Sequence, residues 1–126
     1  MTSEATITAF RRAEELVSRR RPLEALRTLE PVLDVDSDKP SVQLLLGRAY
    51  FFSSQLQRAE NAFLRVLDFD PTDHYARLAL GRTLQRQGRL AEARAQLRLA
   101  VTMHPDEPAY REALGEINTN IALRSS

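Results

Sequence analysis

The chain has 126 residues, of which 43% are hydrophobic and 28% charged, and its net charge is +1. These values are typical of one soluble globular domain, and they provide no overall field that would draw the protein to nucleic acid or anionic lipid. The lack of cysteine excludes a disulfide framework, a thiolate zinc site and a cysteine nucleophile, and no apolar run approaches the roughly 20 residues that cross a bilayer.

The N-terminal residues, "MTSEATITAFRR", show no apolar segment behind a basic start. Such a segment marks a secretory signal, so we expect a cytoplasmic location.

The first predicted pair of helices occupies residues 6–39. Small and apolar residues recur at helical spacing, with Ala13 and Leu16 in its first stretch and Ala25 and Leu29 in its second. Pro31 falls inside the second stretch, where we expect a kink or an early end because proline removes a backbone donor.

Two further helix pairs are predicted over residues 40–73 and 74–107. Pro71 and Pro105 close these pairs, since proline disfavours helix at the preceding residue, and Gly88 supplies the turn inside the second. Asp70 and Asp73 are candidates to cap the helix that follows them. No stretch alternates with a period of two, so we expect no sheet.

The last predicted element is a single helix over residues 108–122. It contains Leu114 and Gly115 but no second helix follows it in the sequence. We expect this helix to cover the exposed apolar edge of the preceding pair.

Several columns of residues repeat at a constant spacing along the chain, the interval from Gly47 to Gly81. Small residues recur in the first helix and in the second helix of each pair, and bulky residues recur between them: Ala13, Gly47, Gly81 and Gly115; Ala25, Ala59 and Ala93; Leu29, Phe63 and Leu97. A glycine inside a helix costs about 1 kcal/mol relative to alanine. Its recurrence predicts that small residues allow two helix axes to approach closely.

These columns resemble the tetratricopeptide repeat family, in which a helix–turn–helix unit of the same length carries a Leu-Gly pair, an alanine, a bulky residue and a closing proline. The second and third repeats carry the pattern in these residues: Leu46-Gly47, Ala49-Tyr50, Leu56, Ala59, Phe63 and Pro71; Leu80-Gly81, Leu84, Gly88, Leu90, Ala93, Leu97, Ala100 and Pro105. The first repeat departs from it, because Arg12 replaces the leucine before the small residue.

The resemblance implies an all-α fold, a right-handed α-solenoid of about three repeats plus a C-terminal capping helix, forming a single domain over residues 1–126. It also implies a concave groove, lined mainly by first helices, that binds a peptide or helix of another protein. The family alone does not specify that partner.

The side of each first helix opposite its small residue is predicted to face this groove, because a helix turns about 100° per residue. The candidate groove residues are Phe10, Glu14, Leu44, Arg48, Phe51, Phe52, Tyr75, Leu78, Arg82 and Arg86. The apolar members would provide contact area and the arginines would pair with carboxylates. We therefore expect an apolar or amphipathic segment with acidic groups as the ligand. Leu45 is expected in the core.

Two alternatives stay open for the apolar side chains. Phe51 and Phe52 could only seal neighbouring repeats, or the groove face could be buried in a homodimer or larger self-association. RNA binding is a further, less favoured interpretation of the six arginines and one acid within residues 77–98.

The sequence does not fit the subclass of the family that binds heat-shock chaperones. Repeat domains that hold the acidic C-terminus of heat-shock chaperones use a clamp of lysine, arginine and asparagine, and the matching places here are Phe10, Glu14, Leu45, Tyr75 and Ala79. Apart from the Tyr75 hydroxyl, none supplies a donor for a carboxylate.

No catalytic residue, cofactor or metal ligand is predicted. His74 and His104 stand at opposite ends of the third repeat without a joining motif, and no metalloprotease, phosphate-loop or nucleophile-elbow pattern occurs. The sequence thus predicts a non-enzymatic adaptor or small chaperone.

Overall fold

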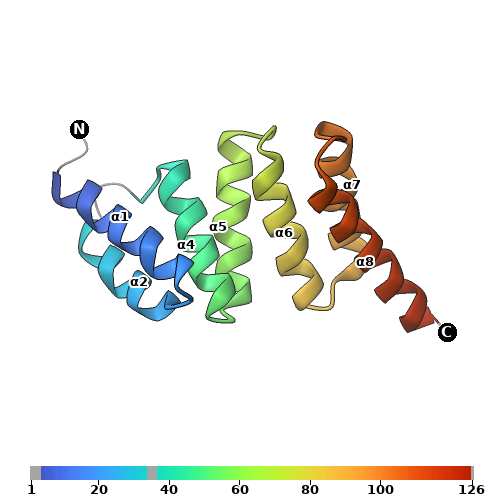
Figure 1. The fold of residues 1–126 in the computed structure, drawn as a ribbon, viewed down its shortest axis with the longest axis horizontal. Helices are drawn as coiled ribbons and strands as arrows, with labels where there is room; N and C mark the ends of the chain where they lie inside the picture. The colour runs from blue at the N-terminus through green and yellow to red at the C-terminus, as the bar shows by residue number, and fades with distance from the viewer. Residues whose placement is uncertain (1–3, 34–36, 126) are drawn as a thin grey trace. The chain divides into compact units, whose positions relative to one another are not determined.

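The computed structural model describes residues 4–33 and 37–125, and every regular element in that part of the chain is a helix. In chain order the elements are α1 (Glu4–Ser18), α2 (Pro22–Leu29), the 3₁₀ turn η1 (Glu30–Val32), α4 (Pro40–Phe52), α5 (Leu56–Phe69), α6 (His74–Arg86), α7 (Leu90–Met103) and α8 (Pro108–Ser125). Figure 1 labels these helices along the ribbon. The predicted all-α fold of helix pairs is confirmed.

The chain divides into two compact units, Met1–Arg65 and Val66–Ser126. In the first unit α1 contacts α2 and α4, and in the second unit α8 contacts α6 and α7. The buried residues of the first unit include Ala13, Leu16, Val17, Ala25, Leu29, Leu45, Leu46 and Ala49, and those of the second include Leu80, Leu84, Ala93, Leu97, Ala100, Ala113 and Ile117. Leu45 is therefore a core residue, as expected. The predicted single domain with repeats 6–39, 40–73 and 74–107 stays a prediction.

Two of the repeated glycines lie where helices pack closely. A Cβ atom added to Gly47 would stand 2.5 Å from Cε1 of Phe63, and one added to Gly81 would stand 2.8 Å from Cγ of Leu97. Both distances are shorter than van der Waals contact, so only glycine allows these helices to approach as they do. The predicted pairing of a small residue with a bulky one is thus present in both units.

Three turns between paired helices share one backbone pattern. Arg20, Ser54 and Gly88 all have a positive φ, of 60°, 63° and 77°. The next amide in each turn donates to a carbonyl five residues earlier, for example Gln55 N to Tyr50 O at 2.8 Å. This is the left-handed helix ending that satisfies otherwise unpaired carbonyls. Only Gly88 adopts it without steric cost.

The ends of the helices follow the sequence signals with two differences, one of which is Asp70, whose side chain accepts from Thr72 N at 3.0 Å and does not cap α6. Asp73 caps α6 by accepting a hydrogen bond from Ala76 N at 2.9 Å. α2 ends at Leu29 and continues as the 3₁₀ turn that contains Pro31, which confirms the expected early end. The last helix runs to Ser125, beyond the predicted limit of residue 122, because nothing in "ALRS" breaks a helix.

Candidate functional site

The part of the candidate groove that lies in the first unit is carried by α1 and α4. Phe10, Leu44, Arg48 and Phe51 are half-buried, while Glu14 is exposed. Half-burial leaves part of each apolar side chain available to a ligand while the rest is held by the fold. These residues therefore meet the minimum requirement for a binding face.

A cavity of about 290 Å³ lies between α1 and the beginning of α4. Its lining combines apolar side chains with charged ones: Thr6, Ile7, Phe10, Arg11, Glu14, Lys39, Ser41 and Val42. Ile7 is 43% exposed although it is a large aliphatic residue. The cavity can therefore receive an apolar side chain beside two cations and one carboxylate.

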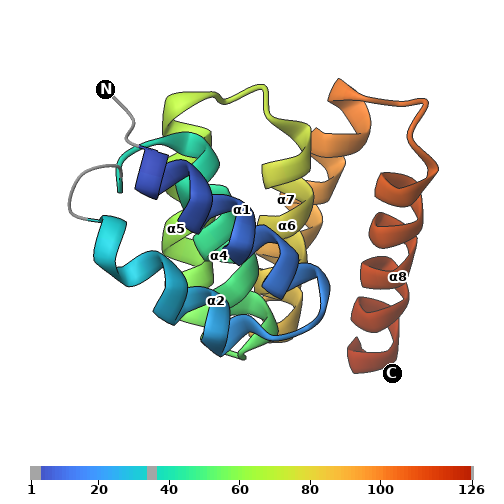
Figure 2. The ribbon, with the colours of Figure 1, turned by 60° about the vertical axis from the view of Figure 1, so that its left-hand side comes forward.

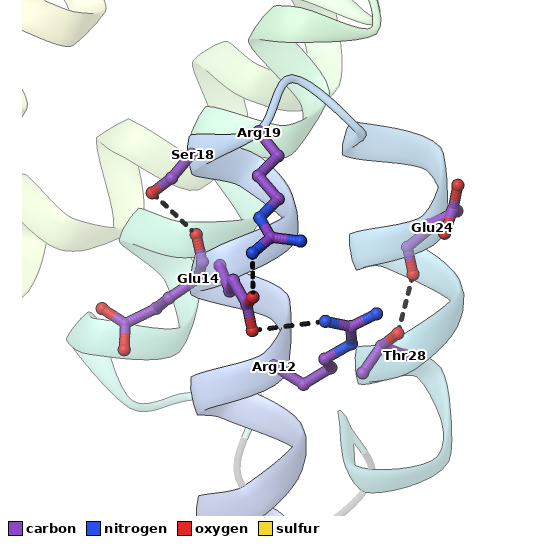
Figure 3. A network of polar contacts seen from close by, with 7 residues as sticks. Arg12, Glu14, Ser18, Arg19, Glu24 and Thr28 are labelled. Atoms are coloured by element: carbon purple, nitrogen blue, oxygen red, sulfur yellow. Dashed lines mark hydrogen bonds and ion pairs between the residues drawn. The ribbon is translucent and has the colours of Figure 1, made fainter.

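The carboxylate of Glu14 points away from Arg12 and Arg19 (Figure 3). Arg12 and Arg19 instead pair with Glu15, at 3.2 and 2.8 Å. The contact drawn in the figure for Glu14 is made by its backbone oxygen, which accepts from Ser18 Oγ at 3.0 Å. Its side chain is thus left to line the cavity.

Phe52, like Phe10, packs against the hydrophobic core of the first unit. The guanidinium of Arg20 lies 3.8 Å from the centroid of its ring, a cation–π contact, and the Phe51 ring meets it edge-on at 5.4 Å. Phe52 therefore has a structural role in closing the edge of the core, whatever else it contacts.

In the second unit the candidate residues lie on α6. Tyr75 is 42% exposed, Leu78 is half-buried and Arg86 is exposed. Arg82 forms an ion pair with Glu116 of α8 at 2.7 Å. The hydrogen bond and charge of Arg82 lower the pKa of the Glu116 carboxyl below its ordinary value. An acidic ligand at Arg82 would have to share this arginine with Glu116.

The structure brings together three ring side chains that the sequence did not link. The imidazoles of His74 and His104 stack with centroids 4.4 Å apart, and His74 Nδ1 lies 2.6 Å from the Tyr110 hydroxyl. Burial raises the pKa of Tyr110, and the charges of Glu107 and Asp73 add to this effect. The sequence held a signal for this contact. His74 begins the first helix of its pair and His104 follows the second helix, and these two positions lie at the same end of a helix pair.

The described residues hold no group of three or more histidine, cysteine or acidic side chains positioned to bind a metal ion. No helix among them is long and apolar enough to cross a membrane. The three-ring cluster joins the beginning of α6 and the residue after α7 to Tyr110 of α8.

Two sequence profiles described as tetratricopeptide repeat match the chain, one over residues 10–74 and one over residues 53–117. Each covers about half of the 126 residues. The chain belongs to the tetratricopeptide repeat family. No curated protein matches the sequence.

Solved tetratricopeptide repeat domains share the fold. The first domain of Spaghetti (RPAP3), bound to the HSP90 peptide SRMEEVD, has a TM-score of 0.84 at 17% identity over 95% of each chain. The second domain of human RPAP3, in complex with the HSP70 peptide SGPTIEEVD, has 0.80 at 16% over 90% of this chain and 95% of that one. The Sgt2 domain from Aspergillus fumigatus has 0.85 at 14% over 98% and 83%. At such identities the likeness establishes the fold alone.

Six residues that line the cavity were not among the groove candidates predicted for this tetratricopeptide repeat domain: Thr6, Ile7, Arg11, Lys39, Ser41 and Val42. Ile7 and Arg11 share the face of Phe10. Lys39 was missed because it precedes α4 and meets α1 only through the packing of the first repeat on the second.

Proposed function

We propose that this tetratricopeptide repeat domain is a non-enzymatic protein-interaction module that binds an apolar or amphipathic segment of another protein. The ligand carries acidic groups. Family membership supports the general role, and two of the similar domains are bound to peptides. The residues of this chain indicate the chemistry of the ligand.

The cavity between α1 and α4 carries the proposal. Ile7, Phe10 and Val42 form an apolar lining, so a ligand side chain placed there leaves water. Arg11 and Lys39 line the same cavity, and Arg48 stands half-buried on α4. An apolar anchor with carboxylates beside it matches this combination of burial and charge.

The proposed ligand differs from the heat-shock peptides bound by the similar domains. Of the places that match their clamp, Leu45 is only 2% exposed and Phe10 and Ala79 have no polar side-chain atom. Glu14 offers no hydrogen-bond donor to a terminal carboxylate. We infer that an internal segment, rather than an acidic chain terminus, occupies the groove.

The test selects peptides from a random displayed library on the purified domain and measures the affinity of the enriched peptides by fluorescence anisotropy. We expect enrichment of one or two large apolar residues together with Asp or Glu. Ile7→Ser and Arg48→Glu should each weaken binding at least tenfold. Leu23→Ser is the matched control, since Leu23 is 55% exposed on α2 and does not line the cavity.

Three results would refute this function: no enriched sequence, enriched basic peptides, or affinity unchanged by Ile7→Ser and Arg48→Glu in folded variants. Light scattering of the domain alone tests the competing self-associating module. A tight dimer that Ile7→Ser dissociates would mean that a second copy covers this face.

RNA binding has less support in the structure than the charge of residues 77–98 suggests. Arg82 and Arg89 are paired with Glu116 and Glu92, and Arg77 donates to Gln96 at 2.9 Å. Saturable RNA binding that falls steeply with salt would reinstate it.

A further inference from the structure

α8 continues as a helix where α6, one repeat earlier, turns back. α6 ends at Arg86 and the chain reverses through Gly88, whereas α8 runs on to Ser125. Arg124 ties this extension of α8 to the α6–α7 turn, because its Nη1 atom donates to the Gly88 carbonyl at 2.9 Å. Figure 2 shows the C-terminal end of α8 in red at the edge of its unit. The extension therefore stands beside the beginning of α7.

The extension and the first turns of α7 border an open cavity. Its volume is about 360 Å³, at the lower end of the range of about 300–1,000 Å³ that small-molecule sites occupy. Leu90, Ala91 and Ile121 form the apolar part of its lining, and Ile121 is half-buried. The cavity can therefore take up the apolar part of a small ligand.

The charged side chains of the lining are three arginines and one glutamate, a net charge of +2. Glu92 is already paired with Arg89, whose Nε and Nη2 atoms lie 3.2 and 2.6 Å from its two carboxylate oxygens. This pair leaves the charges of Arg94 and Arg124 without a carboxylate in the lining. Arg94 is half-buried and has no hydrogen bond or ion pair within residues 4–33 and 37–125. Its guanidinium is therefore available to an anion.

The net charge of this lining distinguishes between the anions that an arginine can bind. A phosphate monoester carries a charge of about −1.5 to −2 at pH 7 and has three acceptor oxygens, so it matches both the charge of +2 and the planar donors of two guanidinium groups. A carboxylate or a phosphodiester carries only one negative charge. Leu90 and Ile121 line the same cavity as these cations, so an organic group attached to the phosphate can leave water there.

We propose that the cavity between the beginning of α7 and the end of α8 binds an organic phosphate monoester. Arg94 and Arg124 hold the phosphate oxygens, and Leu90 and Ile121 contact the organic group. The site lies within the second unit and is separate from the cavity between α1 and α4, so it goes beyond the proposed function and does not depend on it. It gives the domain a second ligand of different chemistry.

The probe is phenyl phosphate, which joins a phosphate monoester to a small apolar ring. It is titrated into the whole ¹⁵N-labelled domain at neutral pH and constant ionic strength, while amide chemical shifts are recorded. We expect saturable shifts centred on Gly88, Ala91, Arg94 and Ile121. Benzoate and methyl phenyl phosphate carry the same ring on a monoanion. Each should bind about tenfold more weakly, the effect of losing one charge-assisted hydrogen bond.

Arg94→Gln and Arg124→Gln should each weaken the binding of phenyl phosphate about tenfold in folded protein. Arg111→Gln is the matched control, since it removes the same charge from an exposed position near the start of α8 that does not line the cavity. It should leave the affinity unchanged. Ile121→Ser should lower the affinity for phenyl phosphate but not that for inorganic phosphate, because only the ring would contact this side chain.

Absence of saturable shifts with phenyl phosphate would overturn the proposal. Equal affinity for benzoate or methyl phenyl phosphate would also overturn it, since the cavity would then accept any anion, including a nucleic-acid backbone. So would binding that Arg94→Gln and Arg124→Gln leave unchanged, with shifts centred on Arg11 and Lys39, because the anion would then occupy the other cavity.

Two further titrations distinguish the sources of such a phosphate. Tighter binding of N-acetyl-phosphotyrosine amide than of phenyl phosphate would support a phosphorylated side chain of a partner protein. Tighter binding of AMP would support a free nucleotide. In both cases Arg94→Gln should weaken the binding about tenfold, as it does for the probe.

Discussion

Replacing each repeated glycine by alanine should have opposite effects in different helices. At Gly115 the change should stabilise the protein by about 1 kcal/mol, the difference in helix propensity, because the new methyl group meets nothing within 4 Å. At Gly47 the same gain is opposed by overpacking. The methyl group would fall 2.5 to 2.9 Å from three ring atoms of Phe63, which is 1% exposed and cannot swing aside.

Overpacking of a core costs about 1–3 kcal/mol, so the net effect of Gly47→Ala is a loss of about 1 kcal/mol. Gly81→Ala should fall between the two, because Leu97 is more adaptable than a ring. The free energies of unfolding of Gly115→Ala and Gly47→Ala should therefore differ by about 2 kcal/mol. This difference corresponds to urea midpoints separated by about 1 M for a domain with a typical denaturant slope.

Urea unfolding followed by far-UV circular dichroism, with the slope fitted for each variant, measures these differences. The reasoning fails if Gly47→Ala is at least as stable as the natural protein, or if Gly115→Ala is destabilised. Hydrogen exchange would then show whether the repeats unfold separately, which is the main complication for a repeat protein.

Three further predictions concern turns, caps and charge. Ser54→Gly should stabilise the protein by about 1 kcal/mol in the same urea assay, since it removes a side chain from a residue with φ of 63°; an unchanged midpoint would contradict this. Asp73→Ala should cost about 1 kcal/mol through loss of the cap on Ala76 N, whereas Asp73→Asn should cost less. Because Arg82 lowers the pKa of Glu116, this carboxylate adds stability that is present above pH 4.5 and is lost as the pH falls through its depressed value. Glu116→Gln should therefore shift the midpoint at pH 7 and not at pH 2; an equal shift at both would refute a charge effect.

The fold could be predicted because small and bulky residues recur at a constant spacing along the sequence. A residue that recurs at one fixed interval must occupy equivalent places in equivalent helix pairs, and Gly47 and Gly81 do so with their bulky partners. Gly115 shows the limit of this argument. The column identifies its place on the helix, but only the structure shows that no atom among the described residues outside its own helix backbone lies within 4 Å of a Cβ added there.

The turn shared by the three helix pairs could not be predicted from the sequence, for a different reason. Its three residues with positive φ are arginine, serine and glycine, so residue type does not identify them as equivalent. Tertiary packing holds Arg20 in this strained state, and its guanidinium gains the ring of Phe52. Helical periodicity placed Phe52 among the groove candidates and gave no sign of this contact with Arg20.

The candidate site was predicted only in outline. Periodicity placed Phe10 and Glu14 on one face of α1, and both line the cavity. Arg82 and Glu116 hold equivalent positions one repeat apart, so periodicity places them in one row, but only the structure shows that they form an ion pair. Whether Arg82, Arg86 and Tyr75 touch a ligand stays a prediction.

The common backbone closure of the three turns makes each helix pair individually observable. The amides of Arg21, Gln55 and Arg89 donate across their turns at 2.8, 2.8 and 2.9 Å. Each of these protons exchanges with solvent only when its own turn opens. The exchange rates of these three amides would thus report local opening separately for each helix pair. A partner bound to one pair would slow the exchange of the amide in that pair more than the exchange of the other two.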